Sequence, residues 1–326
     1  MVSNLTFSQL LTQAAQFYQS GEYAQALDLI TREAGRFPTE ARRTYSWRVC
    51  MAALTNETEL ALRLLEEAVA AGLWYPVTQL REDPDLLSLQ GVPQFEQLVE
   101  VCRQRQAEAQ AQAVPTLTVL EPEGDCRDPL RPCPLLLALH GNNQNAESSL
   151  AFWRSAVSSG WLLALPQSSQ ASGPDIYAWN DRDWALREIQ AHYAGLREQY
   201  AVDPNRGVVA GFSMGGELAI WLALTGAIQV GGFVAVGPGG PYIQEPDNWI
   251  PLIESGRERG LRGYLVVGEQ DIFCYSGTQA LATLLTLHDI PYELEVHPHL
   301  GHEFPPGFEQ SLARALQFIL GQPETS

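Results

Sequence analysis

The pattern of apolar positions along the chain changes near residue 113. Before that point, apolar residues recur every three or four positions, as in LLTQAAQFYQ (10–19) and ELALRLLEEAVA (59–70). This period is that of an amphipathic helix. Helix-breaking residues divide these segments into short hairpins: Gly21, Pro38, Asn56 and Gly72. We therefore expect an all-α domain over residues 1–113, ending in the polar helix 103–114.

After Pro115, short apolar segments alternate with helical ones. Segments such as PLLLALH (134–140) and GYLVVG (263–268) are apolar on both faces, as strands of a sheet covered on both faces must be. The other expected strands are 116–120, 160–166, 206–211, 231–237 and 292–297, and the expected helices are 147–159, 184–200, 214–224 and 277–289. This alternation predicts an α/β domain over residues 114–326, with a mostly parallel, doubly covered sheet.

Composition narrows the classes of partner. The 326 residues are enough for two domains, and 45% of them are hydrophobic. The net charge is −18, and all 20 basic residues are arginine, which disfavours nucleic acid and anionic membranes as partners. The first residues lack the pattern of a signal peptide, and no apolar run reaches the length of a membrane span. We therefore expect a cytoplasmic chain without a membrane span.

The five cysteines are widely scattered. Cys126 and Cys133 lie in one proline-rich loop and could meet. An odd number of cysteines in a chain expected in a reducing compartment favours free thiols over a disulfide.

The segment GFSMG (Gly211–Gly215) joins an expected strand to an expected helix. A sharp strand-to-helix turn forces its central residue, Ser213, into an unfavourable backbone conformation, and larger residues at the two glycine positions would collide. The turn directs the serine oxygen beyond the sheet and aims the amide of Met214, at the helix N-terminus, into the adjacent space. The spacing therefore predicts a nucleophilic serine.

Together, GFSMGG and LALHGNNQN (137–145) resemble the small esterases of the α/β-hydrolase superfamily, namely the carboxylesterase/phospholipase and dienelactone-hydrolase-like groups. The resemblance covers about residues 115–320. It implies that Ser213 is the nucleophile, followed along the chain by an acid and a histidine. It also implies that the backbone amide of Asn142 joins that of Met214 in an oxyanion hole, with His140 bracing that loop.

The base and the acid follow from the same resemblance. His302, in HLGHEF after the last expected strand, matches the Gly-His of the loop that carries the base. Asp271, in GEQDIF, follows the strand 263–268 and matches the acid, with Asp247 and Asp289 as weaker candidates. His297 and His299 precede His302 in an H-x-H-x-x-H pattern, but the spacing supports no closed metal site, so we expect no metal.

The chain also contains a second possible set of triad residues. His140, Asp183 and Ser213 follow the chain order of chymotrypsin-like proteases. That class requires two β-barrels, which alternating strands and helices do not form, so we prefer the triad Ser213, Asp271 and His302. In YAWNDRDW, the expectation for Asp181 and Asp183 is a helix N-cap. Aromatic residues near these loops are candidate pocket residues, with His140: Tyr177, Trp179, Phe273, Tyr275 and Phe304.

The helical half has a resemblance of its own. Residues 14–38 resemble a tetratricopeptide repeat, and ETELALRLLEEAVAAG (57–72) resembles a second, fainter one. Because two repeats bury little core alone, we expect these helices to pack on something else, either covering the pocket or recruiting a protein partner. Only a short connection (237–261) follows the strand after the elbow, so we expect an open, lid-less pocket.

These residues predict a serine hydrolase that cleaves carboxylic esters or thioesters through an acyl-enzyme on Ser213, without a cofactor. A peptidase or an acyltransferase could use the same nucleophile on the same fold. The alternative from a different class is a non-enzymatic protein, in which the tetratricopeptide-like helices bind a partner and the hydrolase-like half no longer reacts.

Overall fold

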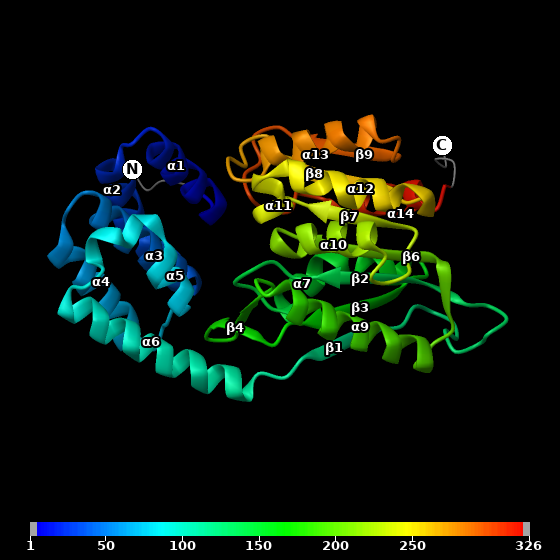
Figure 1. Ribbon diagram of the computed structural model, residues 1–326, viewed down its shortest axis with the longest axis horizontal. Helices are drawn as coiled ribbons and strands as arrows, with labels where there is room; N and C mark the ends of the chain where they lie inside the picture. Colours follow the sequence, from blue (N-terminus) through cyan, green and yellow to red (C-terminus); the bar gives the residue numbers. More distant parts are fainter. Residues whose placement is uncertain (1–4, 322–326) are drawn as a thin grey trace. The chain divides into compact units, whose positions relative to one another are not determined.

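A computed structural model describes residues 5–321 of the chain (Figure 1). The chain forms two compact units. One consists of residues up to Ala113 together with Ala171–Ile176, and the other of Val114–Gln170 and the residues from Tyr177 onwards. No helix within 5–321 combines the length and the apolar character that crossing a bilayer requires.

The first unit is helical. Its α-helices are α1 (Phe7–Gln19), α2 (Tyr23–Glu33), α3 (Ala41–Leu54), α4 (Thr58–Ala70), α5 (Val77–Glu82) and α6 (Pro93–Gln112), and its 3-10 helices are η1 (Ala34–Arg36), η2 (Pro38–Glu40) and η3 (Pro84–Leu89). Gly21 and Gly72 adopt positive φ just beyond α1 and α4, and Asn56 does so between α3 and α4. The breaks expected from the sequence therefore lie where helices end.

The helical unit has its own apolar core. Large side chains such as Met51, Leu65 and Phe95 are fully buried in it. Arg105, on α6, donates to the carbonyl oxygens of Val69 and Leu73 at 2.7 and 2.9 Å. This arginine thereby ties α6 to the end of α4 and to the turn that follows it.

Six residues distant in sequence complete this unit. Ala171–Ile176 lie in a β-hairpin formed by β4 (Gln170–Gly173) and β5 (Ile176–Ala178). The backbone N–H of Ala171 donates to Gln110 Oε1 at 3.1 Å, and Arg42 donates to the carbonyl oxygen of Ser172 at 2.7 Å. These bonds fix the hairpin residues against helices α3 and α6.

The second unit contains a seven-stranded sheet in the order β1-β3-β2-β6-β7-β8-β9. The strands are β1 (Thr116–Leu120), β2 (Cys133–Leu139), β3 (Leu162–Gln167), β6 (Val202–Phe212), β7 (Gly232–Val236), β8 (Arg262–Gly268) and β9 (Tyr292–His297). Only β1 is antiparallel to its neighbour, β3. The carboxyl ends of the parallel strands therefore meet at one edge of the sheet.

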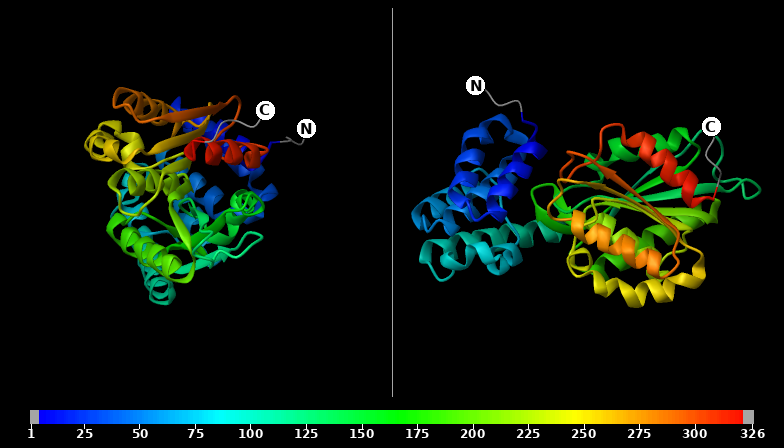
Figure 2. Two further views of the ribbon diagram at one scale, coloured as in Figure 1. Left: turned by 90° about the vertical axis from the view of Figure 1, so that its right-hand side faces the viewer. Right: turned by 90° about the horizontal axis from the view of Figure 1, so that it is seen from above.

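Helices cover both faces of this sheet. Along β2, Leu135, Leu137 and Leu139 point to one face, and Leu136 and Ala138 to the other, as the two-residue period of a strand requires. The first face packs against α9 (Arg182–Gln199), α10 (Met214–Thr225), α12 (Ile250–Gly256) and α13 (Tyr275–Leu287), and the second against α7 (Ala146–Trp153), α8 (Ser155–Ser158) and α14 (Phe308–Ile319). Figure 2 shows α13 and α14 on opposite faces.

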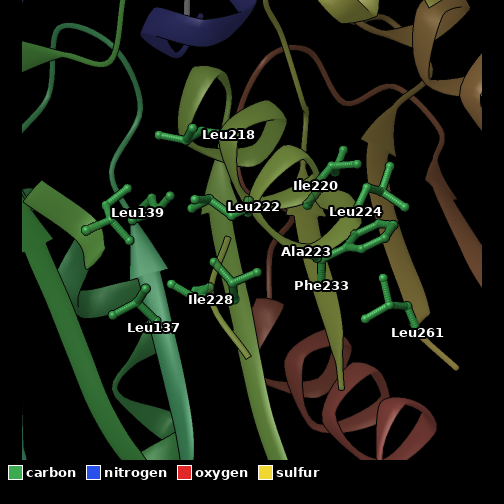
Figure 3. Packing of buried hydrophobic residues seen from close by; sticks show 14 of the residues in the cluster. Leu137, Leu139, Leu218, Ile220, Leu222, Ala223, Leu224, Ile228, Phe233 and Leu261 are labelled. Carbon is green, nitrogen blue, oxygen red and sulfur yellow. The ribbon is translucent and has the colours of Figure 1, made fainter. Parts of the chain in front are cut away.

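Helix α10 crosses the middle of the sheet. Its residues Leu218, Leu222 and Leu224 are fully or almost fully buried and point into the same core as Leu137 of β2 and Phe233 of β7 (Figure 3). Because α10 follows β6 after a single residue, this packing fixes the position of the turn between them. The α/β architecture with a mostly parallel sheet, expected from the sequence, is confirmed.

The structure also differs from the expectations. The hairpin β4–β5 and helix α14 lie in segments for which no element was expected. Cys126 and Cys133 form a disulfide, so the expectation of free thiols was wrong for this pair, and the cytoplasmic location loses that support. The three free cysteines, Cys50, Cys102 and Cys274, are buried.

Candidate active site

Ser213 occupies the turn between β6 and α10 by itself. Its backbone has φ 54° and ψ −125°, a conformation that costs free energy for any residue but glycine. A Cβ atom at position 211 would lie 2.2 Å from the carbonyl oxygen of Gly215, and one at position 215 would lie 2.3 Å from the carbonyl oxygen of His140. The turn can close this tightly only because both positions are glycine.

Three side chains from separate loops meet at this turn. The hydroxyl oxygen of Ser213 lies 2.9 Å from Nε2 of His302, and Nδ1 of His302 lies 2.6 Å from Oδ2 of Asp271. The imidazole thus lies between the hydroxyl and the carboxylate, in position to accept the serine proton while Asp271 holds its tautomer. The structure brings together the three residues expected to form the triad.

Asp271 is held by its own loop. It follows β8, its side chain is almost fully buried, and its second oxygen, Oδ1, accepts the backbone N–H groups of Phe273 and Cys274 at 3.3 and 3.2 Å. These bonds leave Oδ2 directed at His302. The rival candidates do not bond to His302: Asp289 pairs with Arg257, and Asp247 lies in the 3-10 helix η4 (Pro246–Trp249).

Two backbone N–H groups lie in the segments expected to form an oxyanion hole. Met214 is the first residue of α10, so its N–H has no acceptor within the helix. The backbone N–H of Asn142 donates to no acceptor within residues 5–321. The Asn142 side chain is fixed from both ends, since Oδ1 accepts the backbone N–H of Trp179 and Nδ2 donates to Asn180 Oδ1.

His140 and Trp179 support this loop from within the protein. Trp179 Nε1 donates to the carbonyl oxygen of His140 at 2.9 Å, and His140 Nδ1 bonds to the carbonyl oxygen of Gly141. Both side chains are buried, with 0% and 2% exposure. Burial lowers the pKa of His140 to about 4. The expectation that these two residues line a pocket is corrected, because protein atoms enclose both.

The remaining pocket candidates lie closer to the surface. Phe304 stacks between Phe212 and Phe152, with ring centroids 4.8 and 3.9 Å away, and Phe212 in turn contacts the His302 ring. Phe273, next to the acid, is 57% exposed. The backbone of Tyr177 exchanges hydrogen bonds with Asn143 and Gln144, in the loop that carries Asn142. Tyr275 begins α13, and Asp181 caps α9 as expected, by accepting the N–H of Trp184.

The sequence did not predict that Cys274 lies at the site. The sulfur of Cys274 lies 3.6 Å from Nδ1 of His302. Burial raises the pKa of this thiol well above its usual value, which keeps it protonated. The only sequence signal is its position three residues after Asp271, where a tight turn returns the chain toward the carboxylate.

The potential metal ligands of the site are already engaged. Asp271, Cys274 and His302 place ligand atoms within 4.8 Å of one another, as do Cys50, Asp83 and Asp85 in the helical unit. In the first group, however, the bond between Asp271 and His302 uses the atoms that a metal would need. His299 does not belong to either group.

Comparison with known proteins supports the fold. Residues 6–110 match the family model described as the N-terminal domain of A/B hydrolase-like proteins. An uncharacterized protein from Bacillus cereus ATCC 10987 is 28% identical, with a TM-score of 0.54, over 97% of this chain and 99% of its own. Esterase PE8 is 16% identical, with a TM-score of 0.52, over 63% of this chain and 99% of its own, which shows a shared fold.

One curated relative matches a limited part of the sequence. The bifunctional acetylxylan esterase/xylanase XynS20E from Neocallimastix patriciarum is 33% identical over 87 residues. The match covers 26% of this chain and 12% of that relative. The chain therefore spans only a small fraction of the relative's length.

Proposed function

We propose that the protein is a serine hydrolase that cleaves carboxylic esters, and that its second unit, which shares its fold with esterase PE8, carries out the reaction. The observation that carries the proposal is the pair of contacts made by His302, 2.9 Å to the Ser213 hydroxyl and 2.6 Å to the Asp271 carboxylate. A serine hydroxyl becomes a strong nucleophile only when such a base accepts its proton.

The geometry leads to a two-step reaction. His302 accepts the Ser213 proton as the hydroxyl oxygen attacks the ester carbonyl, and the carbonyl oxygen takes the negative charge near the N–H groups of Met214 and Asn142. Each such donor is worth roughly 3 kcal/mol of transition-state stabilisation. His302 then gives the proton to the leaving alcohol, which leaves an acyl group on Ser213. Water, deprotonated by His302, releases the acid and restores the serine.

The connection after β7 supports a short acyl group. Between β7 and β8 the chain forms only α11 (Pro241–Gln244), η4, α12 and the 3-10 helix η5 (Arg257–Arg259), without a lid domain in this segment. The curated relative named as an acetylxylan esterase agrees with an acetyl ester, although it matches over a small part of its length. We propose short-chain esters as substrates, with thioesters as the second leaving-group class.

A fluorophosphonate probe tests the proposal directly, because it reacts only with an activated serine. Wild-type protein should be labelled, Ser213→Ala should not, and the matched variant Ser159→Ala, which changes an exposed serine in another loop, should be labelled like wild type. A series of 4-nitrophenyl esters from acetate to dodecanoate, with matched thioesters and an anilide, then ranks the leaving groups and acyl lengths. Absence of labelling in the wild type would contradict the proposal.

A further inference from the structure

Glu217, on the first turn of α10, is a fully buried carboxylate four residues after Ser213. Its oxygen Oε2 accepts the backbone N–H groups of Tyr242 and Ile243, both at 3.0 Å. Its oxygen Oε1 accepts Arg182 at 2.9 Å. A charge this deeply buried is costly unless it is paired and hydrogen-bonded, and here it has donors from two different segments.

The first pair of bonds caps a short helix. Helix α11 begins after Gly240, which has no side chain and forms no side-chain cap. The Glu217 carboxylate takes that role from another helix, because it accepts the N–H groups of the second and third residues of α11. A Cβ atom at position 240 would lie 2.6 Å from this carboxyl group. The absence of a side chain at Gly240 thus makes room for Glu217.

The segment fixed in this way, Gly237–Gly240, passes directly beside the triad. The N–H of Gly239 donates to the carbonyl oxygen of Ser213 at 3.1 Å. A Cβ atom at position 237 would lie 3.3 Å from His302 Nδ1 and 3.4 Å from Asp271 Oδ2. This segment therefore bonds to Ser213 and lies beside His302 and Asp271, and we expect a shift of the segment to disturb the geometry of the triad.

The bond from Arg182 to Glu217 connects the carboxylate to a second segment, which supports the Asn142 loop. Arg182 lies two residues after Asn180, whose side chain holds the Asn142 side chain at 2.6 Å. The Arg182 guanidinium packs over the ring of Tyr242, 4.2 Å from its centroid. One carboxylate thus connects the segment beside the triad to the segment that supports the expected oxyanion donor Asn142.

We propose that Glu217 is a positioning residue for the ester hydrolysis proposed above, one that holds the Gly237–Gly240 segment and the Asn142 loop in register with Ser213. It takes no part in proton transfer, since its oxygens bond to Arg182 and to α11 rather than to the triad. The inference rests on the proposed function. Loss of the Glu217 carboxylate should therefore lower kcat, because the reacting groups move apart, and should leave KM unchanged.

The experiment compares two carboxylates. Glu217→Gln keeps the shape of the side chain, but its amide N–H₂ replaces one of the two oxygens that accept hydrogen bonds from Arg182 and from α11. Glu295→Gln is the matched control, because Glu295 also accepts an arginine, Arg314, and a buried hydroxyl, Ser311, but contacts no residue of the triad. For each variant, kcat and KM for 4-nitrophenyl acetate, the rate of fluorophosphonate labelling and Tm are measured on the full chain.

We expect Glu217→Gln to lower kcat and the labelling rate by about tenfold, with KM within about twofold of wild type, and Glu217→Ala to lower kcat by about a hundredfold. Glu295→Gln should lower Tm without this loss of kcat. The inference is overturned if Glu217→Gln keeps wild-type kcat, if its loss of kcat equals that of Glu295→Gln, or if neither Glu217 variant folds. Wild-type protein that neither hydrolyses esters nor reacts with the probe would instead refute the proposed function.

Discussion

The hydroxyl oxygen of Ser213 lies 2.9 Å from Nε2 of His302, although 89 positions separate the two residues in sequence. The contact depends on two turns at the same edge of the sheet, one after β6 and one after β9, and on the carboxylate that orients the imidazole. Changes in these supporting groups should therefore alter the reaction without removing the nucleophile.

Asp271→Asn should lower kcat by about 10³- to 10⁴-fold while the fold is kept. The asparagine oxygen would take the place of Oδ1, which accepts the N–H groups of Phe273 and Cys274. The amide N–H₂ would then face His302 Nδ1 and favour the tautomer with its proton on Nε2, which cannot accept the serine proton. Ester hydrolysis and Tm should be measured together. A variant within tenfold of wild-type kcat would contradict this role for Asp271.

Gly239→Ala should impair the site by crowding. The new Cβ atom would lie 2.9 Å from the sulfur of Cys274 and 3.7 Å from the Ser213 hydroxyl oxygen, so we expect kcat to fall by about tenfold. The double variant Gly239→Ala/Cys274→Ala should recover most of that activity, because it removes the sulfur. A double-mutant cycle on kcat measures this recovery, and simple additivity of the two changes would show that the sulfur is not the obstacle.

Trp179→Phe should weaken the oxyanion loop. The change removes the indole N–H that donates to the carbonyl oxygen of His140 and leaves that buried oxygen without this donor. We expect the free energy of unfolding to fall by about 1–3 kcal/mol. We also expect the factor by which kcat falls to be larger than the factor by which KM changes. Denaturant unfolding and steady-state kinetics provide the measurements. The control variant is Phe152→Leu, which changes an exposed aromatic residue outside this loop.

His140 should make the protein less stable in mild acid. Burial lowers its pKa from 6.5 to about 4 in the folded state. Between these values the unfolded chain binds a proton that the folded chain does not, so the free energy of unfolding falls as the pH drops from 6.5 to 4, by about 3 kcal/mol. Above pH 6.5 the imidazole is neutral in both states and contributes no slope.

The measurement is the free energy of unfolding at several pH values for wild type and for His140→Asn, which keeps a donor near the carbonyl oxygen of Gly141. The variant should be less stable at neutral pH because packing is lost, but its stability should fall less steeply with acid. Parallel curves for the two proteins would show that His140 is not the group responsible.

The disulfide between Cys126 and Cys133 should be detectable by counting thiols. Alkylation of the denatured protein should modify three cysteines without a reductant and five with one. The double variant Cys126→Ser/Cys133→Ser should lose about 2 kcal/mol of stability, since the bridge closes a short loop in the unfolded chain. Five modified cysteines without reductant would contradict the disulfide.

The features that the sequence predicts well depend on local geometry. The turn at Ser213 is visible because Gly211 and Gly215 must lack side chains where the backbone folds back on itself. Asp271 and His302 were predicted from the resemblance to the α/β-hydrolases, and the edge shared by the ends of parallel strands explains why their loops meet. The pattern of β2, apolar on both faces, likewise predicts a covered sheet.

Features that arise from contacts between distant segments could not be predicted. Nothing in the sequence near Glu217 shows that its carboxylate caps α11, because the partner residues are 25 and 26 positions away. The sequence around Cys274 does not show that its sulfur lies near His302, because that contact depends on the position of a distant loop. The hairpin β4–β5 has strands of four and three residues, too short for a period to appear. The prediction of free thiols depended on the expected reducing compartment and not on the short separation of Cys126 and Cys133 in one loop.

The assignment of Ala171–Ile176 to the helical unit has a practical consequence for anyone who divides this protein. Cutting the polypeptide at residue 113 does not yield two self-contained pieces. The longer fragment would retain Ala171 and Ser172, whose hydrogen-bonding partners, Gln110 and Arg42, belong to the discarded one. Exchange of whole modules between related proteins would meet the same obstacle, so the helical segment and its hairpin have to be transplanted together.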